Sequence, residues 1–93
     1  MFVLHVGLEV KAGEGPALER DFLGPFTAAI SAQPGLKAVA LLRPDGGGDY
    51  LLSIAFESQA LQQQWVATDL HGEVWPIMES HLAGFTLKTF TTV

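Results

Sequence analysis

Three residues in the last third of the chain have side chains that could act together on a ligand: Trp65, His71 and Trp75. An imidazole titrates close to neutral pH, with an unperturbed pKa of about 6.5, so His71 could accept a proton from a bound molecule. His71 and Trp75 are four residues apart, and a helix would place them on one face. Indole rings offer flat surfaces on which a planar molecule can stack. The spacing therefore indicates a general base beside an aromatic wall.

The same residues also fit a structural role. A histidine at the start of a helix can bond a backbone group, and two indole rings can fill a core. Phe22, Phe26 and Tyr50 share this ambiguity, because each could either line a ligand pocket or pack the interior. The glutamine run 62–64 is typical of a solvated helix face, although one of its amides could reach a ligand, since an amide both donates and accepts hydrogen bonds.

The remaining polar residues do not predict a metal site. The chain has no cysteine, which removes thiolate ligands and thiolate nucleophiles. The pairs His71/Glu73 and Glu79/His81 are two residues apart, so their side chains would point apart on a helix. We therefore predict no metal and no other cofactor, and we predict that His81 is solvated.

The charge distribution limits the partners. The chain of 93 residues has a net charge of −5, and its five Lys and Arg residues are scattered. A phosphate-binding surface needs several adjacent cations, so nucleic acid and anionic membranes are not expected partners. Only 16% of residues are charged, against about 25% in typical domains, which suggests that some apolar surface meets another subunit. The chain shows no signal peptide and no apolar run near 18 residues, and we expect a cytoplasmic protein.

Hydrophobic periodicity divides the chain into alternating strands and helices. Residues 2–11 alternate between apolar and mostly other residues, as a half-buried strand does. Apolar residues at helical spacing fill 14–32, where Gly24-Pro25 predicts a bend rather than two separate helices. The further expected elements are two strands joined by a glycine-rich hairpin (36–43 and 50–57), a helix capped by Ser58, a helical stretch over 69–82 and a last strand over 84–93.

The order β-α-β-β-α-β predicts the fold class. A single α+β domain over residues 1–93, with a four-stranded antiparallel sheet and helices on one face, is the compact solution, a ferredoxin-like fold. The uncovered face would carry a set of apolar residues: Val3, Val39, Leu41, Leu51 and Ala55. Because this face is too apolar to remain in water, we predict a two-fold homodimer.

The chain resembles the antibiotic biosynthesis monooxygenase (ABM) family of the dimeric α+β barrel superfamily. Three short motifs carry the likeness: Lys11-Ala12-Gly13, Pro34-Gly35-Leu36, and Phe56-Glu57-Ser58 followed by Trp65 and His71. The resemblance implies a homodimer with a pocket between the sheet and the helices of each subunit. It also places His71 at a family-matching position. Members of the family include cofactor-independent oxygenases of quinols and phenols.

One departure from the family bears on the ligand. The haem-degrading branch carries an Asn on the first strand, a Trp on the second helix and a His ten residues after that Trp. Trp65 matches, but the chain contains no Asn, and the residue ten positions later is Trp75. Haem degradation is therefore disfavoured. We predict a cofactor-independent monooxygenase of a small quinol or phenol, with His71 as base and Trp65, Trp75 and Phe22 as walls. The alternative is a non-catalytic dimeric module that binds a small ligand or has only a structural role.

Overall fold

The computed structural model describes residues 1–93 and has the predicted order of elements. The N-terminal half contains β1 (Phe2–Val10), α1 (Gly15–Asp21), the π-helical turn η1 (Phe22–Phe26), α2 (Thr27–Ser31) and β2 (Leu36–Leu42). The C-terminal half contains β3 (Tyr50–Phe56), α3 (Gln59–Val66), α4 (Asp69–Glu79) and β4 (Leu82–Thr91). None of the helices combines the length and apolar content that a membrane crossing requires.

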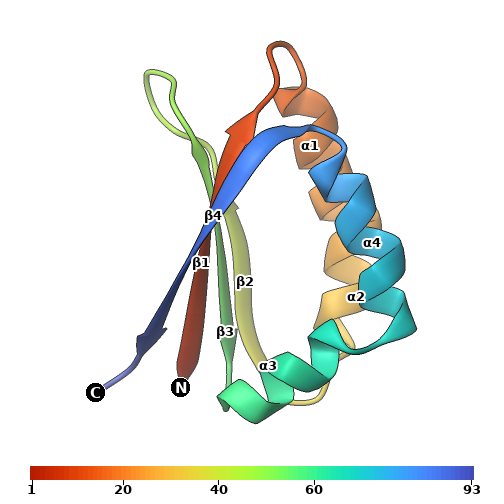
Figure 1. Ribbon diagram of the computed structural model, residues 1–93, viewed down its shortest axis with the longest axis vertical. Helices are drawn as coiled ribbons and strands as arrows, with labels where there is room; N and C mark the ends of the chain where they lie inside the picture. The colour runs from red at the N-terminus through yellow and green to blue at the C-terminus, as the bar shows by residue number, and fades with distance from the viewer.

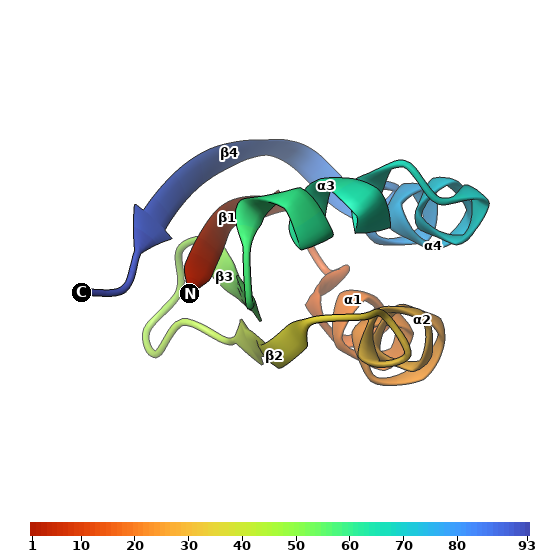
Figure 2. The same ribbon diagram turned by 90° about the horizontal axis from the view of Figure 1, so that it is seen from below.

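The four strands form one antiparallel sheet in the order β2-β3-β1-β4. The two long helical segments, α1 to α2 and α4, lie side by side over one face of this sheet, with α3 at one end of the layer (Figures 1 and 2). The predicted ferredoxin-like fold is confirmed. Its two edge strands are β2 and β4, and the opposite sheet face carries no helix.

The first helical segment is continuous but irregular at Pro25, as the sequence predicts. Proline has no amide hydrogen to donate, so the backbone widens into a π turn rather than an α turn. The Phe22 carbonyl accepts hydrogen bonds from both the backbone amide and the hydroxyl of Thr27. The π turn keeps Phe22 and Phe26 on the inner side of the segment, where both are buried with ring centroids 6.0 Å apart.

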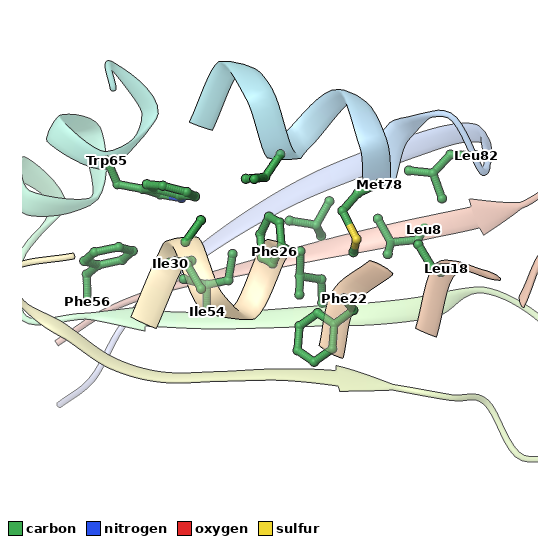
Figure 3. Packing of buried hydrophobic residues seen from close by; sticks show 14 residues of the cluster. Leu8, Leu18, Phe22, Phe26, Ile30, Ile54, Phe56, Trp65, Met78 and Leu82 are labelled. Carbon is green, nitrogen blue, oxygen red and sulfur yellow. The ribbon is translucent and has the colours of Figure 1, made fainter. Parts of the chain in front are cut away.

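The core lies between the sheet and the helices, and it contains no buried polar side chain. Its largest fully buried side chains are Phe26, Phe56, Leu8, Leu18, Ile30, Leu52 and Met78. Figure 3 shows Phe26 near the middle of this layer, with Trp65 entering from α3 and Met78 from α4. This packing fixes the positions of α3 and α4 over the sheet.

Two residues of β2 lie on the sheet face opposite to the predicted one. Val39 and Leu41 pair with Ile54 and Leu52 and pack against the core, so their assignment to the uncovered face is wrong. The cause is an irregularity between Leu36 and Ala38, because a bulge moves the following side chains to the opposite face. Leu42, which is 51% exposed, lies instead on the uncovered face.

Gly35 connects the first helical segment to the sheet in a backbone conformation that suits glycine. Its φ is +79°, in the left-handed region that other residues rarely adopt. A β-carbon at this position would collide with the Leu61 side chain on α3. The glycine therefore allows α3 to pack closely against the start of β2.

Candidate functional site

A cavity of about 190 Å³ lies between the inner sheet face and the segment α3 to α4. The sheet contributes Leu4 and Val6 from β1, Leu52 and Ile54 from β3, and Phe85 and Leu87 from β4. The helical elements contribute Phe26, Gln62, Trp65, Val66, His71 and Trp75. Ten of these twelve residues are hydrophobic, and the two polar ones are Gln62 and His71. The site is thus an apolar pocket with one ionisable group.

Thr68 sets the position of His71. The Thr68 hydroxyl oxygen accepts a hydrogen bond of 3.1 Å from the His71 backbone amide and thereby caps α4. The same hydroxyl donates to the Trp65 carbonyl at 2.7 Å, which ties the end of α3 to the start of α4. The His71 ring then lies edge-on to the Trp65 indole, with ring centroids 5.1 Å apart. His71 thus lies in the first turn of α4 and also lines the cavity, so the structural role and the ligand-contacting role expected from the sequence do not exclude each other.

The His71 ring is suited to accept a proton. Its nitrogens make no hydrogen bond within the chain, and the ring faces the cavity. Burial lowers the pKa of His71 below its usual value of 6.5, because an apolar surrounding disfavours the charged imidazolium. The imidazole is consequently neutral at pH 7, with a free lone pair on one nitrogen.

Three of the five predicted aromatic residues meet at this cavity. Trp65 is only 3% exposed and contacts Phe26 edge-to-face at 6.3 Å between ring centroids. Trp75 lies further out, against Phe85 at 5.3 Å. Phe22 and Tyr50 instead line a separate hollow of about 130 Å³. The structure therefore does not bring all five side chains to one cavity, and their roles in ligand binding stay predictions.

Tyr50 lies outside the cavity because its phenol has another partner. It donates a hydrogen bond of 2.6 Å to Glu19 on α1, and Arg43 binds the same carboxylate through two nitrogens. These hydrogen bonds lower the pKa of Glu19 to about 2, and the bond from Arg43 has a larger effect than the bond from Tyr50. The bond to Glu19 also raises the pKa of Tyr50, so the phenol stays protonated and engaged. Glu19 precedes Tyr50 by 31 residues, and local sequence patterns do not indicate a hydrogen bond over such a separation.

Sequence reasoning missed two residues of β4 that line the cavity, Phe85 and Leu87. They pair with Leu8 and Val6 of β1 and so share the inner face. Both are partly exposed, at 41% and 62%, because β4 is an edge strand and the pocket opens beside it. The alternation of apolar residues in the last strand indicates that Phe85 and Leu87 share one sheet face. It does not indicate that this part of the face lines a pocket.

The predicted solvation of His81 is wrong. Its side chain is only 13% exposed, with Nδ1 2.9 Å from a Glu14 oxygen and Nε2 2.6 Å from an Asp21 oxygen. Hydrogen bonds to these two carboxylates raise the pKa of His81 above 6.5, and Asp21 has the larger effect. The contact joins the α4–β4 junction to both ends of α1. No group of side chains in the structure is arranged as a metal site.

The His81 contact predicts that stability falls as pH rises. A group with a raised folded-state pKa stabilises fully below its unfolded value of about 6.5, and the contribution is lost as pH rises through the folded pKa. We expect the free energy of unfolding in urea to fall by about 1–2 kcal/mol between pH 6.5 and 9. His81→Gln should remove this slope. An unchanged slope in the variant would contradict the assignment.

The fold and the site together define a class: a ferredoxin-like α+β domain with a small, mostly apolar pocket and a single imidazole between its sheet and its second helical segment. The sequence profile of antibiotic biosynthesis monooxygenases matches residues 1–74, and the chain belongs to this family. No protein of curated function matches the sequence.

Solved structures support the same fold. MhuD from Mycobacterium tuberculosis, a haem degrader with two haems bound in its active site, is 27% identical, with a TM-score of 0.79 over 100% of this chain and 96% of its own. SnoaB from Streptomyces nogalater, a cofactor-independent oxygenase whose structure is that of a mutant, is 16% identical, with a TM-score of 0.86 over 98% of this chain and 91% of its own. The likeness to SnoaB shows the fold alone.

Proposed function

We propose that the protein is a cofactor-independent monooxygenase of a small quinol or phenol, with His71 as the general base. The observation that carries this proposal is the neutral, unbonded imidazole in a cavity lined by ten hydrophobic residues and one further polar residue, Gln62. Membership of the antibiotic biosynthesis monooxygenase family supports it.

The cavity offers what such a reaction asks of a protein. His71 removes the phenolic proton, and the resulting phenolate is a better electron donor to O₂ than the phenol. The indoles of Trp65 and Trp75 provide faces for a planar ring. The hydrocarbon lining excludes water from the reactive intermediate. Pockets for drug-sized ligands measure about 300–1,000 Å³, so a cavity of about 190 Å³ favours a substrate of one or two rings.

Ligand binding without chemistry is the competing function, and haem is its most specific candidate. MhuD, at 27% identity, binds haem, and an unbonded neutral imidazole such as that of His71 can ligate iron. Two features favour a small quinol or phenol over haem. The cavity volume is small, and the side chains that β1 presents to the cavity, Val6 among them, are all hydrocarbon.

Oxygen uptake and haem titration separate these functions. The protein should consume O₂ with at least one member of a panel of benzene-, naphthalene- and anthracene-diols, at a rate above that of the diol alone. Haem added under the same conditions should produce no Soret shift at one equivalent. Uptake indistinguishable from the protein-free rate across the panel, or stoichiometric haem binding with a histidine-ligated spectrum, would refute the oxygenase.

We also propose that the uncovered sheet face joins two copies of the chain. The face presents Val3, Leu42, Leu51 and Phe90, and Phe90 is 40% exposed. Burying such an apolar surface against its own copy is favourable and produces a closed two-fold assembly.

Sedimentation tests this interface. The wild type should sediment at twice its 10.0 kDa mass at about 10 µM, and Leu42→Lys should shift the population toward the monomer. Leu23→Lys is the matched control, because Leu23 is 74% exposed on the helical side of the molecule. A monomeric wild type, or equal dissociation of both variants, would contradict the proposed face.

A further inference from the structure

Gln62 is the second polar residue that lines the cavity, beside His71. We propose that Gln62 donates a hydrogen bond to a carbonyl oxygen of the ligand while His71 faces the ligand's hydroxyl. The substrate class is then a planar phenol that also carries a conjugated carbonyl. This inference rests on the proposed function, because it assigns a second recognition group in the same pocket.

The placement of Gln62 is the first argument. Of the three consecutive glutamines on α3, only Gln62 lines the cavity, whereas Gln63 and Gln64 are exposed to solvent. Gln62 lies three residues before Trp65, so the two side chains share one face of α3. Trp65 in turn contacts the His71 ring at 5.1 Å between centroids. The two polar groups therefore flank the same indole.

The unpaired state of the amide is the second argument. The Gln62 side chain makes no hydrogen bond within the chain, while the half-buried Gln33 donates its amide to the Ala29 carbonyl at 3.2 Å. A ligand that covers this amide must supply a hydrogen-bond partner, because a donor that is buried and left unpaired is costly. The ten hydrophobic lining residues cannot supply it.

The two groups have complementary roles in removing the proton. When the hydroxyl O–H bond breaks, the proton moves to the His71 ring, and the negative charge spreads through the conjugated ring onto the carbonyl oxygen. The Gln62 amide is a donor and meets that charge, and hydrogen bonds to charged groups are stronger than those to neutral ones. A phenol without a carbonyl presents nothing to this amide. Gln62 is thus a specificity-determining residue rather than a second base.

Calorimetric titration under nitrogen tests the inference without requiring turnover. The probes are 4-hydroxyacetophenone, which carries the hydroxyl and the conjugated carbonyl, and 4-ethylphenol, which lacks the carbonyl. The wild type should bind 4-hydroxyacetophenone about 10-fold more tightly, and Gln62→Leu should remove this difference while leaving the affinity for 4-ethylphenol within about twofold. Gln63→Leu, an identical change on the exposed side of α3, should behave as the wild type.

The opposing outcomes are separate from those of the oxygenase test. Equal affinity of the wild type for both probes, no binding of either at millimolar concentration, or equal weakening of both by Gln62→Leu would overturn the role of Gln62. Selective binding that Gln62→Leu abolishes, in a protein that consumes no O₂ with any diol of the panel or with 2,5-dihydroxyacetophenone, a quinol that also carries the carbonyl, would support the recognition group and refute only the oxygenase.

Discussion

Replacing His71 by glutamine is expected to lower kcat/KM for the oxidised quinol by about 10²–10⁴-fold at pH 7, the usual contribution of a positioned general base. Glutamine keeps a polar side chain of similar reach in the first turn of α4, and the cap from Thr68 uses only the backbone of residue 71. The loss should therefore be chemical rather than structural, and it is measured as oxygen uptake under steady-state conditions.

The pH profile gives this prediction a second readout. Burial lowers the pKa of His71, so kcat/KM of the wild type should fall on the acid side with a midpoint below pH 6.5, where the imidazole becomes protonated. The variant should lack this acid limb. His5→Gln is the control, because His5 lies on the opposite sheet face against Phe90, 4.9 Å between ring centroids. Equal rates for the wild type and His71→Gln would exclude His71 as the base.

Phe26→Ala is expected to cost about 3–5 kcal/mol of unfolding free energy, the largest stability loss we predict for a single substitution. Phe26 is 2% exposed and lies in the π turn, in contact with both Phe22 and Trp65. Its removal would leave a void that the Pro25-containing turn cannot easily close. Domains are usually stable by only about 5–15 kcal/mol, so the substitution should remove a large share of the total stability.

Urea unfolding at pH 7 measures this loss, and Phe85→Ala is the matched control. Both phenylalanines line the cavity, but Phe85 is 41% exposed on an edge strand, so the same truncation should cost less than half as much. Equal losses for the two variants would show that Phe26 does not hold the two helical segments and the sheet together.

The sequence predicted those features whose cause is local. The alternation of β1 placed Val6 and Leu8 in the core, and Pro25 marked the irregular turn, because both patterns act within a few residues. The structure brings Trp65 and His71, which the sequence analysis singled out, to one cavity, and the roles predicted for them stay predictions.

The features that were missed depend on contacts between distant segments. His81 finds its carboxylates 60 and 67 residues away, and Tyr50 finds Glu19 at a separation of 31. Helical rotation within one element cannot reveal such partners. The inward position of Val39 depends on a bulge, which shifts the face of every later residue in its strand without a strong signature in residue type.

The origin of the cavity lining has an evolutionary consequence. Both polar side chains and both indoles come from the continuous segment of α3 and α4, whereas the sheet presents only hydrocarbon. A few substitutions in that segment can therefore change the substrate during evolution, while the strand pairing of the sheet stays the same. Descendants of one ancestor would then keep superimposable backbones long after their reactions have diverged.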